Sequence, residues 1–343
     1  MTAPMLAIRN LHLTMKSFDG EAHVLNGIDL VVKRREIWGL VGETGCGKSL
    51  TGLSVSRLVP SPPARYAAGE IIFDGEDLLK LPEGAMRALR GRRIGMIFQD
   101  PTTNLNPVFP IGEQLVDVAL SVARHSPEIL GLDASAGRAA RKAAARRLAG
   151  DMLDKVGIPD ARARLDDYPH QFSGGMRQRV LIAMTLIGRP DLLIADEPTT
   201  ALDVSVQAQV LKLFTTMVDE FGMGVVLITH NLGVVAQTCT HVAVMYAGNI
   251  VESGPVAAVI GNPRHPYTRA LLAAIPTREV KRGALQGLAG AVPNLILPPP
   301  GCRFAPRCAL AGADCRAATP PTVALGDGHA AACLRLDGAG RAA

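Results

Sequence analysis

One eight-residue segment near the N-terminus limits the possible folds more than any other feature of the chain. Residues 42–49 read Gly-Glu-Thr-Gly-Cys-Gly-Lys-Ser and fit the phosphate-binding loop (P-loop) pattern. An apolar, strand-like run precedes the segment, and a helix is expected from Lys48 onward. The glycines let backbone N–H groups wrap phosphate oxygens at a helix N-terminus, where the helix dipole favours anions. The pattern predicts a strand, a loop and a helix around a bound nucleotide.

Two side chains of this loop have expected roles of their own in holding ATP. Lys48 adds a positive charge next to the phosphates, and Ser49 offers a hydroxyl group to Mg²⁺. The alternative is an ordinary glycine-rich turn, which the flanking strand and helix disfavour. The predicted nucleotide-binding residues here are Gly42, Glu43, Thr44, Gly45, Cys46, Gly47, Lys48, Ser49 and Thr51.

A second motif is acidic. Residues 192–197 form an apolar run that ends in Asp196 and Glu197. In P-loop ATPases an aspartate at this place helps to hold Mg²⁺, so we assign that role to Asp196. Glu197 is placed to polarise the attacking water as a general base. Two acids at a strand end are also compatible with a plain loop start, but the P-loop upstream argues against that alternative.

A third motif narrows the class of ATPase. Ser173 is a predicted N-cap, and Gly174 and Gly175 leave backbone N–H groups bare, which makes a second anion site. One ATP does not need two such sites within one subunit, so this helix is expected to cap a nucleotide held by another subunit. Ser-Gly-Gly followed by Gln178 and Arg179 resembles the signature motif of the ABC ATPases.

The resemblance implies roles for further residues. Gln99 matches the Q-loop glutamine, which contacts Mg²⁺ or the water and couples hydrolysis to a membrane subunit. Asp203 matches the D-loop at the dimer interface, and His230 matches the switch histidine that touches the γ-phosphate. Many relatives carry aspartate after this histidine, whereas this chain has Asn231. Phe18 is the candidate for stacking on adenine, with Met15 in a comparable register.

Longer strings resemble the ATP-binding subunits of oligopeptide, dipeptide and nickel importers. These strings are Phe98-Gln99-Asp100-Pro101, Leu105-Asn106-Pro107, residues 195–203 and His265-Pro266-Tyr267-Thr268. The resemblance implies a peripheral subunit at the cytoplasmic face of a membrane that powers peptide uptake, with nickel or another small solute as the alternative cargo. It also implies two transmembrane permease subunits, a second homologous ATP-binding subunit and an extracytoplasmic binding protein. Import rather than export rests on the resemblance alone.

Four of the six cysteines crowd the last fifth of the chain: Cys302, Cys308, Cys315 and Cys333. Disulfides are rare in cytosolic proteins, so four thiols there suggest a tetrathiolate site for Zn²⁺ or an iron–sulfur cluster. The spacing lacks the paired C-x₂-C of a typical zinc site, which favours iron–sulfur over zinc. In peptide-importer relatives the corresponding tail can bind a 4Fe–4S cluster. Four free cysteines in a loop are the remaining alternative.

The alternation of strand-like and helix-like segments predicts an α/β fold with a mostly parallel core sheet. Apolar runs at residues 38–41, 94–98, 192–195, 225–228 and 242–245 are the expected buried strands. Residues 7–32 alternate and carry turn signals at Asp19-Gly20 and Asn26-Gly27, which predicts an antiparallel β subdomain. We expect an ABC ATPase domain at 1–262, a helical subdomain inserted at about 104–180, and a loop-rich extension at 263–343.

Composition excludes some other classes. Aromatic residues make up only 4% of the chain, too few for a platform that stacks single-stranded nucleic acid, and we expect no nucleic-acid partner. The net charge of +5 is concentrated in one basic run, which favours a solvated helix face over a nucleic-acid or lipid patch: Arg138, Arg141, Lys142, Arg146 and Arg147. No secretory signal and no run of about 18 apolar residues is found.

Two functional alternatives remain. ABC ATPases that act in DNA repair or translation typically carry two cassettes or a long coiled coil, whereas this chain has one P-loop and a short helical insertion. A regulatory partner that does not hydrolyse ATP is disfavoured because Glu197, Lys48 and His230 are all intact.

Overall fold

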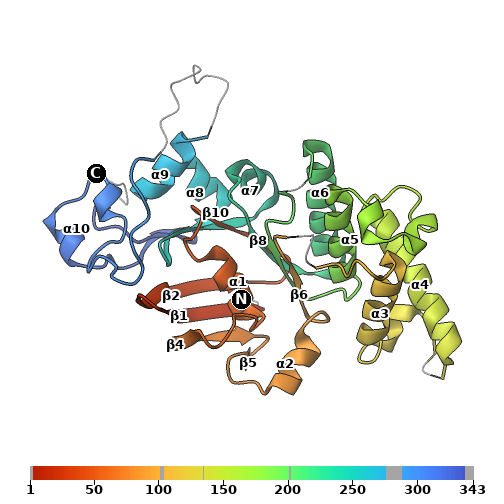
Figure 1. Ribbon diagram of the computed structural model, residues 1–343. Coiled ribbons are helices and arrows are strands. Elements are labelled where there is room, and N and C mark those ends of the chain that lie inside the picture. The colour runs from red at the N-terminus through yellow and green to blue at the C-terminus, as the bar shows by residue number, and fades with distance from the viewer. Residues whose placement is uncertain (1–2, 101–103, 134, 201, 276–287, 337–343) are drawn as a thin grey trace. The chain divides into compact units, whose positions relative to one another are not determined.

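The computed structural model describes residues 3–100, 104–133, 135–200, 202–275 and 288–336 (Figure 1). The chain divides into two compact units. The first unit comprises Met1–Lys80 and Leu227–Ala343, and the second unit comprises Leu81–Val226. Pro101 and Ala201, which belong to the importer-like strings of the sequence, lie outside the described residues.

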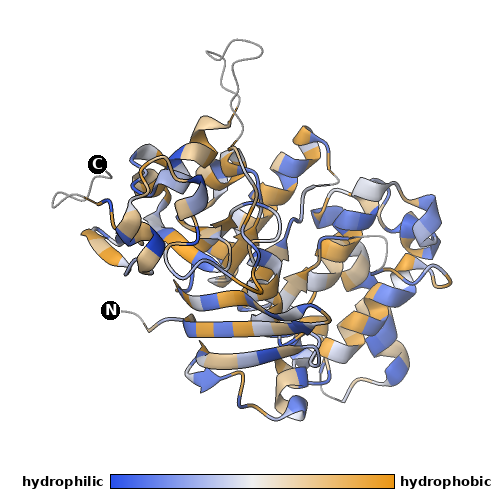
Figure 2. Cartoon of the chain, turned by 60° about the vertical axis from the view of Figure 1, so that its left-hand side comes forward, coloured by the Kyte–Doolittle hydropathy of each residue, from blue (hydrophilic) through white to orange (hydrophobic). Residues whose placement is uncertain are grey.

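The N-terminal part of the first unit is an antiparallel sheet. Its strands are β1 (Leu6–Ser17), β2 (Gly20–Val32), β4 (Ala64–Phe73) and β5 (Glu76–Asp77), in the order β2-β1-β4-β5. Hydrophobic and hydrophilic residues are interspersed along these strands, so that one set of side chains is buried (Figure 2). The predicted antiparallel subdomain is therefore confirmed.

One of its two predicted turns is wrong. The turn before Gly20 joins β1 to β2, since Ser17 pairs with Gly20. Asn26 and Gly27, in contrast, lie inside β2, where the pairing shifts between Leu25 and Ile28 and Gly27 has a φ of +70°. The Asn-Gly pair makes a β-bulge because glycine tolerates the left-handed conformation that the extra residue needs.

A second sheet of the first unit carries the P-loop strand. Strand β3 (Ile37–Val41) pairs in parallel with β9 (His241–Tyr246), and β9 pairs antiparallel with β10 (Asn249–Pro255). Beyond β10 the C-terminal extension adds β12 (His329–Ala331) and β11 (Val323–Gly326), both antiparallel. The helices of this unit are α1 (Lys48–Val55), α7 (Leu232–Thr238), α8 (Val256–Gly261), α9 (Pro266–Ala273) and α10 (Ala313–Ala317).

Three aromatic rings join the extension to this sheet. The ring of Phe304 lies 5.1 Å from that of Tyr246 and 5.3 Å from that of Tyr267, measured between ring centroids. All three side chains are at most 2% exposed and belong to one hydrophobic cluster with Val41 and Val244 of strands β3 and β9. The P-loop strand and the extension therefore share a core.

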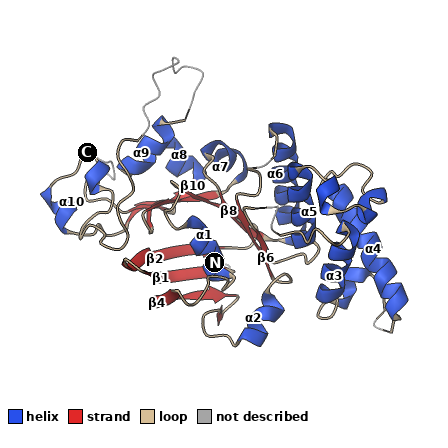
Figure 3. Ribbon diagram, viewed as in Figure 1, coloured by secondary structure: helices blue, strands red, loops and turns tan. Residues whose placement is uncertain are grey.

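The second unit is mainly helical (Figure 3). Its parallel strands β6 (Ile94–Ile97) and β7 (Leu192–Asp196) are neighbours, and the boundary between the units falls within β8 (Gly224–Ile228). Its helices are α2 (Glu83–Leu89), α3 (Ile111–Val122), α4 (Arg138–Lys155), α5 (Gly174–Leu186) and α6 (Val204–Phe221). All five predicted apolar runs form strands, namely β3, β6, β7, β8 and β9.

The basic run of the sequence lies on α4. Arg138, Lys142 and Arg147 are exposed, and Arg146 donates to a carboxylate oxygen of Asp166 at 2.7 Å. Among the described helices, none is long and apolar enough to cross a membrane.

Replacement of Phe304 by alanine tests the shared core. We expect the free energy of unfolding to fall by ~3–5 kcal/mol, because a fully buried ring leaves a cavity. Chemical denaturation of the purified chain without nucleotide measures this change. Phe18→Ala is the matched control, since Phe18 is fully exposed and its loss should change the unfolding free energy by less than ~0.5 kcal/mol. Equal effects of the two substitutions would contradict the shared core.

Candidate functional site

The P-loop has the predicted order of strand, loop and helix. It follows β3, and α1 begins at Lys48. Gly42 has a φ of +152°, and a β-carbon there would lie 2.1 Å from the carbonyl oxygen of Met245. Gly47, the N-cap of α1, has a φ of +104°. Both positions therefore require glycine, which leaves the first N–H groups of α1 available to an anion.

Lys48 is folded back over the loop. Its ammonium group donates to the carbonyl oxygens of Gly42 at 2.7 Å and Glu43 at 2.9 Å, and the residue is only 7% exposed. Cys46 is buried beside it, and burial raises the pKa of the Cys46 thiol. Thr51 is also buried, and its hydroxyl donates to the Gly47 carbonyl oxygen at 3.0 Å. This hydrogen bond joins the Thr51 side chain to the backbone at the start of α1.

The P-loop is hydrogen-bonded to two side chains that the sequence did not indicate. The hydroxyl of Tyr267 accepts the N–H of Glu43 at 2.9 Å, and Arg307 donates to both carboxylate oxygens of Glu43, at 2.6 and 3.0 Å. The strings that carry them, around His265 and Cys308, were visible in the sequence. Nothing in the chain's local pattern indicated that they contact the P-loop.

Glu197 and Gln99 lie together in the second unit. Strands β6 and β7 are parallel neighbours, so the residues that follow them meet at one edge of the sheet. The Gln99 amide donates to a carboxylate oxygen of Glu197 at 3.4 Å, and the Thr200 hydroxyl donates to the same oxygen at 3.0 Å. Asp196 is 5% exposed at the end of β7, while Glu197 has a φ of +47°. The strained backbone turns Glu197 out of the strand.

The signature segment has the predicted cap. The Ser173 hydroxyl accepts the N–H of Met176 at 3.3 Å at the start of α5, and Ser173 and Gly174 are exposed. The apolar face of this helix is buried at Val180 and Ala183. Asp203 is exposed and caps α6 in the same way, since its carboxylate accepts the N–H of Val206 at 3.0 Å.

His230 is exposed in the first unit, with Thr229 between it and the end of β8. Asn231, which replaces the aspartate of many relatives, is the N-cap of α7, and its side-chain oxygen accepts the N–H groups of Gly233 and Val234 at 3.0 and 3.3 Å. Asparagine and aspartate cap helices about equally well, so the substitution keeps the local structure after His230.

The candidate adenine contact lies on the β1–β2 hairpin. Phe18 is fully exposed in the turn, and Met15 is half-buried in β1. An exposed ring is open to stacking, so Phe18 stays the prediction.

The four C-terminal cysteines line one small cavity, together with His265 and Phe304. The N–H of Cys302 donates to the carbonyl oxygen of Cys315 at 2.8 Å, and the sulfur of Cys333 accepts the N–H of Arg335 at 3.3 Å. Burial raises the pKa of the Cys302, Cys308 and Cys333 thiols. In the described part of the chain, no group of three or more His, Cys, Asp or Glu side chains has the geometry of a metal site.

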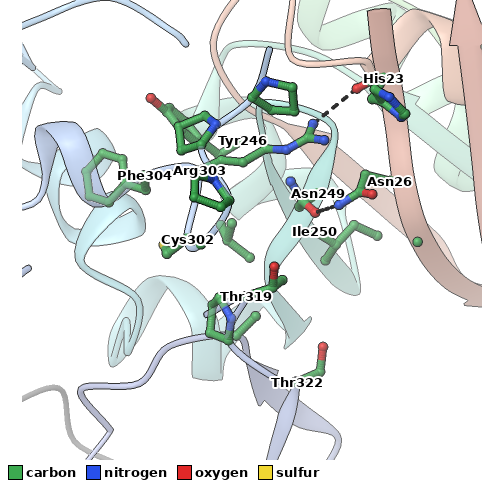
Figure 4. Close-up of a pocket in the computed structure, with 18 of the residues that line it drawn as sticks. His23, Asn26, Tyr246, Asn249, Ile250, Cys302, Arg303, Phe304, Thr319 and Thr322 are labelled. Atoms are coloured by element: carbon green, nitrogen blue, oxygen red, sulfur yellow. Dashed lines mark hydrogen bonds between the residues drawn. The ribbon is translucent and has the colours of Figure 1, made fainter. Parts of the chain in front are cut away.

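A larger cavity of about 500 Å³ lies between the β1–β2 hairpin and the extension (Figure 4). Asn26 donates to Asn249 at 2.8 Å on its wall, and the guanidinium of Arg303 donates to the carbonyl oxygen of His23 at 3.1 Å. Among the described residues that line it, none comes from the P-loop, so this cavity is not the nucleotide site.

Comparison with protein families shows which class of ATPase this chain belongs to. A family model described as "ABC transporter" matches residues 25–200, and one described as "Oligopeptide/dipeptide transporter, C-terminal region" matches residues 251–315. The chain belongs to the family of ABC transporter ATP-binding subunits. The resemblance of the sequence to ABC ATPases and its resemblance to the importer subunits are thereby confirmed.

Relatives of this ABC subunit are similar over nearly its whole length. A putative peptide import ATP-binding protein of Brucella ovis is 47% identical over 97% of both chains. The dipeptide transport ATP-binding protein DppD of Bacillus subtilis is 44% identical, over 97% of this chain and 95% of the relative. Among solved structures, the dimeric ATP-binding cassette MJ0796 in a post-hydrolysis state bound to ADP and Pi is 25% identical, with a TM-score of 0.62, and covers 74% of this chain and 99% of that one.

The fold and the relatives identify this chain as an ATPase subunit with the P-loop of the ABC family.

Replacement of Gly42 by alanine should weaken the binding of ADP by ~10-fold or more, because the new β-carbon collides with Met245 and the backbone strain is large. Calorimetric titration with ADP measures the affinity. Gly261→Ala is the control, because its new β-carbon would meet no atom within 4 Å. Unchanged affinity in Gly42→Ala would show that this loop does not hold the phosphates.

Proposed function

We propose that this ABC ATPase subunit powers the import of short peptides from the cytoplasmic face of a membrane. The observation that carries the proposal is the match of residues 251–315 to the C-terminal region of oligopeptide and dipeptide transporters. Relatives named for peptide, dipeptide and oligopeptide transport, at 42–47% identity over 95–97% of the chain, support it. Nickel or another small solute is the second candidate cargo.

The catalytic cycle requires two ATP-binding subunits. The P-loop holds one face of a nucleotide, and the exposed N-cap at Ser173 and Gly174 is suited to contact the γ-phosphate of a nucleotide held by a second subunit. Asp203 takes the D-loop role at the same interface. We propose a heterodimer with a second, homologous ATP-binding subunit, together with two membrane-spanning permeases and an extracytoplasmic binding protein.

Hydrolysis is assigned to Glu197 as general base. The hydrogen bonds from Gln99 and Thr200 hold one of its carboxylate oxygens in place, and a carboxylate is suited to orient and polarise a water molecule. His230 stabilises the γ-phosphate, and Lys48 provides charge at the phosphates. Gln99 also transmits the state of the site to a permease.

Ser49, Asp196 and Gln99 are the residues that we assign to Mg²⁺, because hydroxyl, carboxylate and amide oxygens are the hard ligands that Mg²⁺ prefers, directly or through water. When bound, the ion would neutralise phosphate charge.

A 4Fe–4S cluster is our proposal for the four-cysteine cavity, with zinc as the alternative. Four thiols around one cavity match the ligand number of both, and an N–H donated to the sulfur of Cys333 suits a thiolate. When bound, the cluster would supply a structural or redox-sensitive cross-link of the extension.

The import proposal is tested with a tagged chain purified from gently solubilised native membranes. Mass spectrometry should find two multi-spanning proteins and a second P-loop subunit. The complex, placed in liposomes with its binding protein, should take up labelled peptides only with ATP. Uptake of Ni²⁺ but not of peptide would select the second cargo. Recovery of the chain alone, or with nucleic acid, from the soluble fraction would refute the transporter assignment.

Glu197→Gln tests the general base. We expect ATP turnover to fall ~10²-fold or more while nucleotide affinity stays within about twofold, because the amide keeps the size and loses the basic oxygen. Phosphate release by the assembled complex measures turnover. Glu220→Gln, an exposed change on α6, is the control that should hydrolyse ATP normally. Normal turnover in Glu197→Gln would remove Glu197 from this role.

The cluster proposal predicts a brown protein after anaerobic purification, with absorbance at about 400 nm and about four irons per chain. Cys308→Ser should bleach this absorbance, whereas Cys239→Ser, at the end of α7, should keep it. Colourless protein with about one zinc per chain would refute the iron–sulfur cluster. Protein free of both metals would mean that the four thiols are unligated.

A further inference from the structure

Arg307 of the C-terminal extension reaches the P-loop. Its two terminal nitrogens donate to the two carboxylate oxygens of Glu43, at 2.6 and 3.0 Å. The same guanidinium donates to the Tyr246 hydroxyl at 3.3 Å and to the carbonyl oxygens of Leu288 and Ala289 at 3.0 and 2.9 Å. These five hydrogen bonds match the five N–H groups of an arginine side chain.

This contact is unlike an ordinary surface ion pair. The Arg307 side chain is only 5% exposed and that of Glu43 is 28% exposed, whereas the Arg9–Glu70 pair of the same unit is 59% and 35% exposed. The bidentate geometry fixes both side chains in one orientation. The hydrogen bonds to Glu43 raise the pKa of Arg307, so the guanidinium stays charged. Loss of the carboxylate would leave a buried charge without its partner.

Glu43 is held at three points at once. Arg307 binds its carboxylate, the Tyr267 hydroxyl accepts its N–H at 2.9 Å, and Lys48 donates to its carbonyl oxygen at 2.9 Å. Lys48 is the residue assigned to the phosphates. The position of Glu43 therefore sets the shape of the loop and the place from which Lys48 reaches the nucleotide.

Arg307 belongs to the cysteine-bearing loop. From Cys302 to Cys308 the chain forms a turn and a short 3₁₀ helix (Ala305–Arg307). The N–H of Ala305 donates to the Cys302 carbonyl oxygen at 2.9 Å, and the N–H of Cys308 donates to the Ala305 carbonyl oxygen at 3.3 Å. Cys308 follows Arg307 directly, and its side chain lines the four-cysteine cavity. A change in the fold of this loop must move Arg307.

We propose that Arg307 is a positioning residue for nucleotide binding, through which the order of the loop at residues 302–308 controls the affinity of the P-loop for ATP and ADP. When the loop is folded, Arg307 fixes Glu43 and the P-loop is preorganised. When the loop is disordered, the P-loop loses one of its three holds and binds nucleotide more weakly.

The first test measures ADP binding to the purified chain by calorimetry, and KM and kcat for ATP in the assembled complex. Arg307→Ala should weaken ADP binding and raise KM by ~10-fold, with kcat within about twofold, because Arg307 acts on binding alone. Arg307→Lys should restore part of the affinity, since it keeps one charged donor. Arg9→Ala, which breaks the exposed pair with Glu70, should bind ADP normally.

A double-mutant cycle separates the contact from general destabilisation. Glu43→Gln breaks the same ion pair from the P-loop side, and Arg307→Ala combined with Glu43→Gln should lose no more affinity than the worse single variant. Additive losses, or unchanged affinity in both single variants, would overturn the proposal. If Arg307→Ala fails to fold, Arg307→Lys and Glu43→Gln complete the test.

The link to the cysteine loop has its own readout. Cys308→Ser should weaken ADP binding in the natural chain and add nothing in the Arg307→Ala chain. Faster protease cleavage of the loop in Cys308→Ser protein would show that the loop is disturbed. Unchanged ADP binding in that same protein would then overturn this link. The result is independent of which metal the thiols hold, because metal content and colour test that proposal separately.

Discussion

The binding of nucleotide by this chain depends on a loop that must present the first backbone N–H groups of α1 to the ligand. Two glycines with left-handed backbone, Gly42 and Gly47, make that conformation possible. Lys48 then closes over the loop by donating to two of its carbonyl oxygens. Such a loop has few contacts of its own, so the structure behind it has to keep it in shape. In this chain the supports come from strand β9 and, within the C-terminal extension, from Tyr267 of α9 and from Arg307.

Because the P-loop depends on these supports, the C-terminal extension is part of the structure that shapes the P-loop. Its strands β12 and β11 continue the sheet that carries the P-loop, and Phe304 packs against Tyr246 and Tyr267 in the core beneath that loop. Members of the ABC family share the ATP-binding cassette, and MJ0796, covered over 99% of its length, aligns with 74% of this chain. An extension that shares a core with the cassette can influence nucleotide binding without contacting the nucleotide itself.

Local patterns were sufficient to predict most of the fold and many of the candidate residues. The P-loop, the apolar strands and the cap at Ser173 depend on neighbours within a few positions, so their spacing was readable. The Asn26-Gly27 bulge was misread because its backbone conformation also suits a tight turn, and only pairing with β1 decides between them. The contact of Arg307 with Glu43 was not predictable, because 264 positions separate the two residues. Nothing in the neighbouring sequence distinguishes either charged side chain from one that is exposed to solvent. The functional roles of all the candidate site residues, including Glu197 and His230 as well as Phe18 and the four cysteines, stay predictions.

We propose that two chains complete each ATP site, with the P-loop of one subunit and the exposed signature helix of the other contacting the same nucleotide. The most direct test uses a variant of the second ATP-binding subunit in which the general base is replaced by glutamine. Increasing amounts of this variant are added to a fixed amount of this chain, and ATP turnover per molecule of this chain is measured. We expect low turnover for the chain alone and a rise to saturation as the second subunit is added. Turnover per chain that is high alone, and unchanged at every concentration of the second subunit, would contradict it.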